Sequence, residues 1–414
     1  MTDTNSRIWT KINSRLGKHR FFYVCRDWER AAAILGAQKC FIITNYGQEA
    51  KKISARYKNI ILIKEKKLLD TNELLAREEI KSLVKKNDFI VVFKNTPQIE
   101  KICARNGWKL LNPPSVLAEK VETKISQVKW LGNLSRFLPP HKIIICKNIK
   151  WKQERFILQF NRAHTGGGTI LVKTEKQLNE IKNKFPLREA RVSDFVEGPV
   201  FTNNNIVWND NVLCGNINYQ ITGLTPFTDR PFATIGNDWA LPNKILSKKQ
   251  INEYQKIANL IGKKLSRDGW KGLFGIDIVM DKKTGKLYLL EINARQPAST
   301  TYESQLQKKA SSENYLTTFE AHLGSLLKIK YDNPELTEIK NGSQIVRRIT
   351  ENKKINNTKL NEAKKKLMKN GFNAIAYENT EPGSDLLRIQ IKNGIMTEHN
   401  KLNEIGKLIK KCLN

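Results

Sequence analysis

Four short apolar runs near the start of the chain constrain its fold more than any other feature. Each is rich in β-branched and aromatic residues, and longer polar segments of helix-compatible composition separate them; the runs cover residues 21–25, 40–44, 60–63 and 89–93. Strands that are apolar on both faces are typical of a parallel sheet covered by helices on both sides. We therefore predict a doubly wound parallel α/β domain over residues 1–117. The chain contains no G-x-G-x-x-G motif, so no dinucleotide-binding fingerprint is expected.

The rest of the chain predicts α+β units. We expect a long domain over residues 118–327, divided into subdomains 118–195 and 196–327, and a small α+β domain over residues 328–414. The expected helices cover residues 123–137, 175–184, 248–267 and 358–369, with one more at the C-terminus. The expected strands cover residues 141–146, 156–160, 170–172, 190–196, 272–281, 286–293, 344–349, 373–377 and 386–391, with a β meander over 200–240.

The charge and cysteine content exclude several classes of protein. Lysine and arginine number 72 against 40 acidic residues, a formal net charge of +32, but the lysines are scattered rather than gathered in one arm. We therefore expect a mild preference for anionic ligands and no nucleic-acid partner. The six cysteines form no C-x-x-C pair, which argues against a disulfide scaffold or a zinc ribbon. An apolar signal segment and an apolar stretch of about 18 residues are both missing, so a soluble cytoplasmic protein without a membrane partner is expected.

The segment 272–293 predicts a β-hairpin that carries acidic residues. A three-residue turn at 283–285, with glycine last, places Lys282 opposite Lys286 and Asp277 opposite Glu291. Because side chains alternate along a strand, Asn293 shares the face of Glu291. Directly opposed residues have Cβ atoms about 4.5–5.5 Å apart. The hairpin therefore brings Asp277, Glu291 and Asn293 to one patch.

This acidic patch needs a positive partner. Two close carboxylates raise each other's pKa, and the apolar residues around them indicate burial on at least one face. A divalent ion with oxygen ligands fits, since Mg²⁺ is usually held by one or two carboxylates together with phosphate and water. A salt bridge to lysine or arginine, or a solvated outer face, explains the same residues equally simply. From this hairpin alone the alternatives stay open.

A second hairpin has a glycine-rich tip at residues 165–169, Thr-Gly-Gly-Gly-Thr. Because its three glycines have no side chains to block access, their backbone N–H groups are able to cradle phosphate. It is not a Walker loop, because the chain contains no G-x-x-x-x-G-K-[ST] motif. A flexible hairpin tip without a ligand is the alternative.

The order of these features resembles the ATP-grasp superfamily, which includes D-alanine–D-alanine ligase and biotin carboxylase. A helix carrying Lys124 comes first, followed by the glycine-rich hairpin, a strand ending in Glu197-Gly198, and the hairpin with Asp277 and Glu291. The resemblance covers roughly residues 118–325, and its most specific part is the segment LLEINARQPAST. It implies an ATP-grasp domain that follows the family's usual N-terminal α/β domain.

The resemblance also implies roles for individual residues. Asp277, Glu291 and Asn293 match the Mg²⁺ ligands, with Mn²⁺ as the alternative ion. Arg295 matches a residue that stabilises charge developing on phosphate or on an acyl intermediate, and Lys124 matches the first phosphate-contacting lysine. We therefore expect Arg295 and Lys124 to be catalytic and ATP to be the nucleotide. The other nucleotide contacts implied are the lid glycines Gly166, Gly167 and Gly168, the nearby His164, and the hinge residues Ser193, Asp194 and Val196 that would recognise adenine.

Two positions depart from the family pattern. Gln159 stands where the family has its second phosphate-binding lysine, and Val200 stands where it has a ribose-binding glutamate. A glutamine can contact phosphate but brings no charge. Arg162, His164 or Lys173 could supply the missing cation.

The activity implied is an ATP- and Mg²⁺-dependent ligase that joins a small-molecule carboxylate to an amine through an acyl phosphate. A carboxylase-like member that activates bicarbonate is one alternative, and a non-enzymatic basic nucleic-acid-binding protein is another. A homodimer is compatible with the sequence, which does not identify either substrate.

Overall fold

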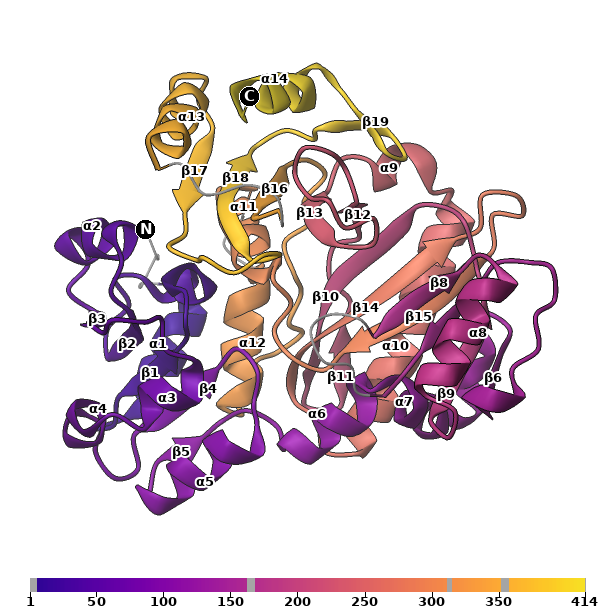
Figure 1. The fold of residues 1–414 in the computed structure, drawn as a ribbon. Coiled ribbons are helices and arrows are strands. Elements are labelled where there is room, and N and C mark those ends of the chain that lie inside the picture. Colours follow the sequence, from indigo (N-terminus) through magenta and orange to yellow (C-terminus); the bar gives the residue numbers. More distant parts are fainter. Residues whose placement is uncertain (1–5, 162–167, 311–314, 351–356, 414) are drawn as a thin grey trace.

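The computed structural model describes residues 6–161, 168–310, 315–350 and 357–413. Figure 1 shows an N-terminal α/β domain, a central region, a smaller sheet with its helix at one side, and a C-terminal segment above the centre. Within the described ranges, no helix is both long and apolar enough to cross a membrane.

The N-terminal domain has the predicted architecture. Its five strands form a sheet in the order β3-β2-β1-β4-β5, and every pair in it is parallel. Alternate residues of β1 enter two different cores: Phe21 and Tyr23 one, Phe22 and Val24 the other. Both faces of the sheet are therefore covered, which explains the continuous apolar runs. The elements are α1 (Arg7–Leu16), β1 (Phe21–Val24), the 3-10 segment η1 (Trp28–Ile34), β2 (Cys40–Asn45), α2 (Gln48–Arg56), β3 (Ile60–Ile63), α3 (Thr71–Leu75), α4 (Glu78–Leu83), β4 (Phe89–Val92), α5 (Pro97–Arg105) and β5 (Lys109–Leu110).

The next unit contains a four-stranded antiparallel sheet, which we call the lid sheet, with the order β6-β9-β7-β8. The helix expected over 123–137 is divided: α7 begins after the extended residue Thr123 and is followed by 3-10 turns from Gly132, whose φ is +55°. The elements are α6 (Ser115–Glu122), α7 (Lys124–Leu131), η2 (Gly132–Phe137), β6 (His141–Ile145), η3 (Cys146–Asn148), β7 (Phe156–Gln159), β8 (Thr169–Val172), α8 (Glu175–Lys184) and β9 (Glu189–Asp194).

The largest sheet has nine strands and runs from the acidic hairpin into the C-terminal segment. Its order is β15-β14-β10-β12-β13-β16-β18-β17, with β11 paired to β10. The central elements are β10 (Val200–Trp208), β11 (Asn211–Leu213), β12 (Asn218–Thr222), β13 (Thr234–Asp238), α9 (Pro242–Ile245), α10 (Lys248–Arg267), β14 (Gly272–Met280), β15 (Leu287–Asn293), α11 (Thr300–Ala310) and α12 (Thr318–Leu326). The C-terminal elements are β16 (Ser343–Arg348), α13 (Asn357–Lys369), β17 (Asn373–Ala376), β18 (Asp385–Ile391), β19 (Met396–Glu398), β20 (Lys401–Leu402) and α14 (Glu404–Leu413).

The C-terminal strands extend the central sheet. Strand β16 pairs with β13 in antiparallel register, with Ile345 opposite Gly236. The buried carboxylate of Asp238 at the end of β13 reinforces this junction, because it accepts hydrogen bonds from four backbone N–H groups. Its donors are Ala240 at 2.8 Å, Leu241 at 2.9 Å, Ile395 at 2.6 Å and Met396 at 2.9 Å. The boundary expected at 327/328 therefore does not separate two sheets.

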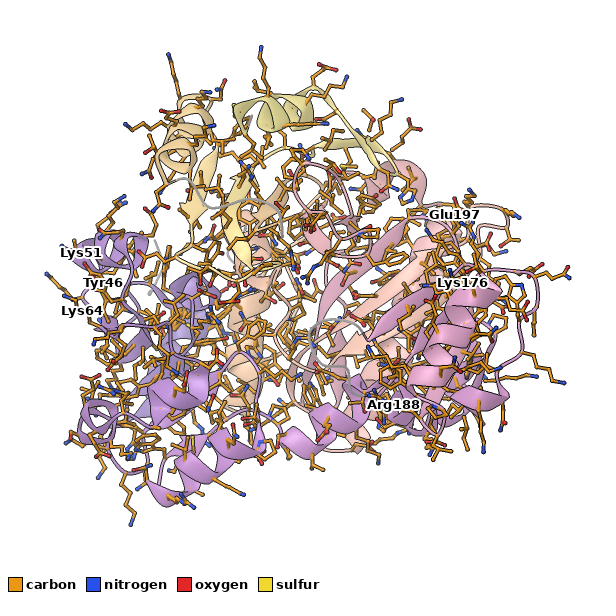
Figure 2. The ribbon with its side chains drawn as sticks, viewed as in Figure 1. Tyr46, Lys51, Lys64, Lys176, Arg188 and Glu197 are labelled. Carbon is orange, nitrogen blue, oxygen red and sulfur yellow. The ribbon has the colours of Figure 1, made fainter. Side chains whose placement is uncertain are left out.

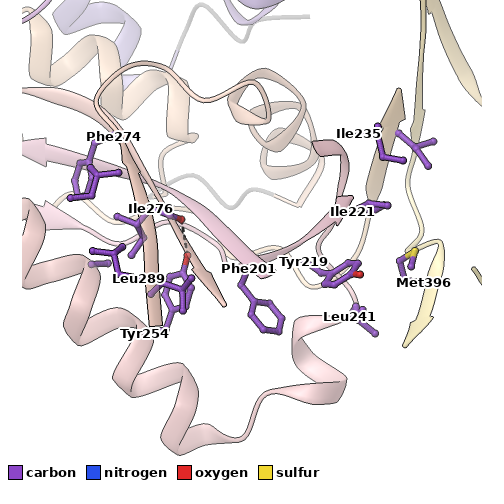
Figure 3. Packing of buried hydrophobic residues seen from close by; sticks show 14 of the residues in the cluster. Phe201, Tyr219, Ile221, Ile235, Leu241, Tyr254, Phe274, Ile276, Leu289 and Met396 are labelled. Atoms are coloured by element: carbon purple, nitrogen blue, oxygen red, sulfur yellow. Dashed lines mark hydrogen bonds between the residues drawn. The ribbon is translucent and has the colours of Figure 1, made fainter. Parts of the chain in front are cut away.

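The two faces of strands β10 and β14 enter different environments. Phe201, Phe274 and Ile276 pack with Tyr254 of α10, whose hydroxyl donates to the Ile276 carbonyl at 3.2 Å (Figure 3). On the other face, Trp208 packs in the core that contains Phe319 of α12. Thr202 and Asp277, which face each other across β10 and β14, occupy this second face by alternation. Strand periodicity thus directs Asp277 away from the apolar core beneath α10.

The turn of the acidic hairpin differs from the prediction. Asp281, rather than Lys282, is opposite Lys286: the Asp281 N–H donates to the Lys286 carbonyl at 2.9 Å. The Asp281 side chain accepts from the Lys283 and Thr284 N–H groups at 2.7 and 2.9 Å. The loop is therefore one residue longer than the one over 283–285, because the aspartate organises it.

A β-bulge restores the predicted register at the acidic residues. Ile278 pairs with Leu289, whereas Asp277 pairs with Glu291, so Leu290 is an extra residue on β15. Such a residue leaves the ladder locally unpaired and increases the twist. The longer loop and the bulge offset each other, and Asp277 faces Glu291 as predicted.

The basic side chains are dispersed over the structure. Figure 2 places Lys51 and Lys64 on the N-terminal domain and Lys176 and Arg188 on the lid unit at the opposite side. This distribution is consistent with the scattered lysines of the sequence.

A buried glutamate beside the sheet predicts a pH-dependent stability. Glu303 of α11 is fully buried and accepts hydrogen bonds from Thr318 Oγ1 at 3.0 Å and from Asn204 Nδ2. Burial raises the pKa of Glu303 to about 7. Between its ordinary pKa and about 7, the native state holds a proton that the unfolded chain has released, so its contribution to stability falls as pH rises through this window.

We expect the free energy of unfolding of the wild type, relative to Glu303→Gln, to fall by about 3 kcal/mol between pH 4 and pH 8. Urea unfolding of both proteins in EDTA at the two pH values measures this difference. Glu398→Gln is the control, because Glu398 lies in an exposed ion pair with Lys401. Equal pH dependence of the wild type and Glu303→Gln would contradict the assignment.

Candidate active site

Three oxygen-bearing side chains meet where β14 and β15 pair. Asp277 is directly opposite Glu291, and Asn293 Nδ2 donates to Asp277 Oδ2 at 3.3 Å. Asp277 is 6% exposed, while Glu291 is partly accessible, with 36% of its side chain exposed. The prediction that these three residues share one patch is confirmed.

The pKa values of the two carboxylates move in opposite directions. Burial, and secondly the charge of Glu291, raise the pKa of Asp277. A hydrogen bond with Thr202, its partner on β10, opposes this rise. The ammonium of Lys124 lowers the pKa of Glu291. The first proton that the pair takes up as pH falls therefore goes to Asp277.

Lys124 is the cation nearest to the pair. It begins helix α7 and forms an ion pair with Glu291 Oε2. The start of the helix is fixed by Asn161, whose side-chain oxygen accepts from the Ile125 N–H at 2.7 Å. The salt bridge that the sequence left as an alternative is thus present in the structure. Since only 17% of the Lys124 side chain is exposed, the ammonium is held close to the carboxylates.

Arg295 lies beyond Asn293 and is paired with a different carboxylate. Its guanidinium forms an ion pair with Glu122 of α6, which also accepts from Lys94 Nζ at 2.6 Å. Glu122 is therefore shared between the N-terminal domain and the segment after β15. The negative charges of Glu122 and Glu291 raise the pKa of Arg295 against the effect of burial.

Gln159 contacts a buried arginine that the sequence analysis did not single out. Arg191 on β9 is opposite Gln159 on β7, and its Nε donates to Gln159 Oε1 at 2.9 Å. The amide nitrogen of Gln159 donates to Thr169 Oγ1 at 2.9 Å. Arg191 also reaches Gln127 Oε1 at 3.4 Å and the Leu290 carbonyl at 3.3 Å. A signal was present in the sequence: an arginine between the apolar residues Ala190 and Val192 of a predicted strand.

The predicted hinge residues lie where β9 leaves the lid sheet. Ser193 and Asp194 are the last residues of β9, and the Asp194 N–H donates to the Pro140 carbonyl at 3.0 Å. Val196 follows, and Glu197 forms ion pairs with Arg155 and Lys282. Gly198 approaches β14 closely: a Cβ there would lie 1.9 Å from the Met280 carbonyl oxygen. The segment thus links the lid sheet to the edge of the acidic hairpin.

The glycine-rich tip is described only in part. Gly168 closes the β7–β8 hairpin, where its carbonyl accepts from the Phe160 N–H at 3.3 Å. His164, Gly166 and Gly167, together with Arg162, lie outside the described residues. Lys173, proposed as a replacement cation, is exposed beyond the far end of β8.

The patch has the chemistry of a site for a hard divalent cation. Among the described residues, no group of three or more His, Cys, Asp and Glu side chains is placed to bind a metal. The donors here are instead two carboxylates and the Asn293 amide oxygen, and carboxylate and amide oxygens are ligands that Mg²⁺ accepts. The repelling pair of the buried Asp277 and the partly exposed Glu291 supports this fit, since a cation would offset the cost of placing the two carboxylates together.

Comparison with known families identifies the region that contains these residues. The sequence profile of the ATP-grasp domain family matches residues 121–299. The chain contains an ATP-grasp domain. The match includes Lys124, Gln159, Arg191, the acidic hairpin and Arg295. A sequence search of curated proteins finds no match to this chain.

Solved structures share the fold over nearly the entire chain. N5-carboxyaminoimidazole synthetase from Staphylococcus aureus matches with a TM-score of 0.64 and 12% identity, covering 96% of this chain and 97% of that one. N5-carboxyaminoimidazole synthase from Aspergillus clavatus, in complex with ADP and 5-aminoimidazole ribonucleotide, matches with a TM-score of 0.64 and 13% identity over 95% and 98%. L-amino acid ligase from Bacillus licheniformis matches with a TM-score of 0.61 and 13% identity over 95% and 97%. At this identity the likeness concerns the fold, which the chain shares with these structures over nearly its whole length.

Proposed function

We propose that the protein is an ATP- and Mg²⁺-dependent ligase that activates a carboxylate as an acyl phosphate and joins it to an amine. The observation that carries the proposal is the pair formed by the buried Asp277 and the facing Glu291, with Asn293 and Lys124 beside it, inside an ATP-grasp domain. Structural relatives in complex with ADP or ATP support the choice of nucleotide.

The reaction has two steps. An oxygen of the substrate carboxylate attacks the γ-phosphorus of ATP, the bond from that phosphorus to the β,γ-bridging oxygen breaks, and ADP leaves. The amine nitrogen then attacks the acyl carbon, phosphate leaves with the pair of electrons of the C–O bond, and the nitrogen loses a proton. Both reactants of the first step are anionic, so the site must control their repulsion.

The residues divide this task between them. Asp277, Glu291 and Asn293 would hold Mg²⁺, which when bound supplies positive charge to phosphate oxygens. Lys124 would exchange its ion pair with Glu291 for contacts to phosphate, because the metal would then neutralise Glu291. Arg295 follows the end of β15, the strand that carries Glu291 and Asn293, and would stabilise charge developing on the acyl phosphate. The segment with Ser193, Asp194 and Val196 would contact the adenine, and the tip with His164, Gly166, Gly167 and Gly168 would cover the phosphates.

Bicarbonate as the activated carboxylate is a second candidate. It is favoured by the relatives whose names describe synthesis of a carboxyamino compound. The chemistry of the first step is the same, so the same residues would serve.

The test is nucleotide binding followed by a substrate screen. Calorimetry with the full chain should show ATP binding that strengthens when Mg²⁺ replaces EDTA. Phosphate release should then appear only with a particular pairing from a panel of carboxylates, including bicarbonate, and amines. Absence of ATP binding in the presence of Mg²⁺ would overturn the proposal. Release with bicarbonate but with no other carboxylate would select the second candidate.

A further inference from the structure

Arg191 is a buried cation whose partners are all neutral. Only 4% of the residue is exposed, and it lies in the middle of β9. Its guanidinium donates to the amide oxygens of Gln159 and Gln127 and to the carbonyl of Leu290. None of these acceptors carries a formal charge.

The other two cations of the site differ in this respect. Lys124 is paired with Glu291, and Arg295 with Glu122. Among the described residues, by contrast, no carboxylate lies within ion-pair distance of Arg191. Burial lowers the pKa of Arg191 to about 10, and the more distant charge of Glu291 only partly opposes this. A buried charge without an opposite charge is costly unless a ligand completes it.

The acceptors of Arg191 also show where such a ligand would lie. Leu290 is the bulge residue next to Glu291, so its carbonyl is free from the regular ladder and faces Arg191. Gln127 lies three residues after Lys124 on α7, which places the two on neighbouring positions of the helix surface. Arg191 therefore reaches the space between the helix that carries Lys124 and the strand that carries Glu291.

The two glutamines hold the guanidinium in place. Gln159 Nε2 donates to Thr169 Oγ1 at 2.9 Å, and Gln127 Nε2 donates to the Val121 carbonyl at 2.9 Å. Each amide oxygen is thereby directed at Arg191. Both glutamines act as positioning residues that orient the cation without cancelling its charge.

We propose that Arg191 binds the triphosphate of the nucleotide and supplies, from β9, the positive charge that Gln159 does not supply from β7. This inference rests on the proposed ATP site. It assigns Arg191 as a phosphate-binding residue and Gln159 as the residue that positions it.

The test compares nucleotides with and without phosphates. In Arg191→Gln, the dissociation constant of MgATP should rise about 10- to 100-fold, the range expected when a charged hydrogen-bonding group is lost. The dissociation constant of adenosine should stay within about twofold, because adenosine offers no phosphate to Arg191. Arg105→Gln, an exposed arginine on α5, is the matched control and should bind both ligands like the wild type.

Moving the cationic side chain from position 191 to position 159 distinguishes phosphate binding from a purely structural role of Arg191. Because Gln159 and Arg191 are opposite each other, the double variant Gln159→Lys/Arg191→Gln returns one cation to the same strand pair. It should recover MgATP affinity to within about fivefold of the wild type, whereas Arg191→Gln alone should not. Thermal unfolding identifies any variant that fails to fold, and Arg191→Lys provides a milder change that keeps the charge.

The outcomes are distinct. A wild type that does not bind ATP would overturn the proposed function and this inference together. A wild type that binds ATP, with Arg191→Gln binding MgATP as tightly, would overturn only the role of Arg191. Equal losses of ATP and adenosine affinity, or no recovery in the double variant, would show a merely structural arginine and would also overturn it.

Discussion

Replacing Glu291 by glutamine should remove the Mg²⁺-dependent part of ATP binding and slow ADP formation about 1000-fold, roughly the effect of losing one strongly oriented electrostatic contact in an active site. Glutamine keeps the size of the side chain but removes the negative charge beside Asp277. Affinity for ATP in EDTA should not fall, because removing an anion reduces repulsion of the triphosphate and releases Lys124 from its ion pair. Calorimetry with and without Mg²⁺, together with coupled measurement of ADP, provides both readouts.

Glu398→Gln is the matched control for this experiment. Glu398 is an exposed carboxylate on β19, and its loss should change neither quantity. Asp277→Asn should repeat the loss of Mg²⁺ dependence from the opposite strand. Retention of Mg²⁺-strengthened ATP binding in both Glu291→Gln and Asp277→Asn would contradict the metal assignment.

Removing the carboxylate of Asp238 should destabilise the protein by about 4 kcal/mol or more, since each buried N–H left without a partner costs about 1–3 kcal/mol. Asp238 is fully buried and accepts from the N–H groups of Ala240, Leu241, Ile395 and Met396. Asp238→Ala leaves all four N–H groups without an acceptor. The expected loss of unfolding free energy is a large fraction of the total stability of a typical domain. A lower urea midpoint and faster hydrogen exchange at residues 395 and 396 are the expected observations.

Asp332→Ala tests whether any lost aspartate has this effect. Its carboxylate is 85% exposed in an ion pair with Arg7, and exposed pairs contribute little. Asp238→Asn, which keeps one acceptor oxygen, should fall between the two. If Asp238→Ala unfolds at the same urea concentration as Asp332→Ala, the carboxylate does not hold the C-terminal strands to β13.

The elements predicted best are those whose burial is encoded locally. Strands β1, β3 and β4 are apolar at every position, and β2 over its first four, because both faces of their sheet are covered. Helix α10 begins at a capping box on Ser247. The pairing of Asp277 with Glu291 was also within reach, since a short hairpin fixes its own register. Even there the predicted turn was wrong, and the bulge at Leu290 compensated for it.

Features that depend on distant segments were not predictable in the same way. The sequence around Gln344 contains no local signal that β16 pairs with β13, which lies more than a hundred residues earlier in the chain. The role of Arg191 was not predictable for a related reason. It depends on contacts with Gln159, Gln127 and Leu290, which belong to three other elements. An arginine between two apolar residues of a strand is a usable signal, but only the assembled fold shows what surrounds it.

The charged residues of the candidate site lie on two different sheets, and this affects the electrostatic potential of the site. Arg191 belongs to the lid sheet, whereas Asp277 and Glu291 belong to the nine-stranded sheet, and the hydrogen bond to Leu290 crosses from one to the other. Breaking this hydrogen bond would move the positive charge of Arg191 away from Asp277 and Glu291. The attraction of this region for anions therefore depends on the contact between the two sheets.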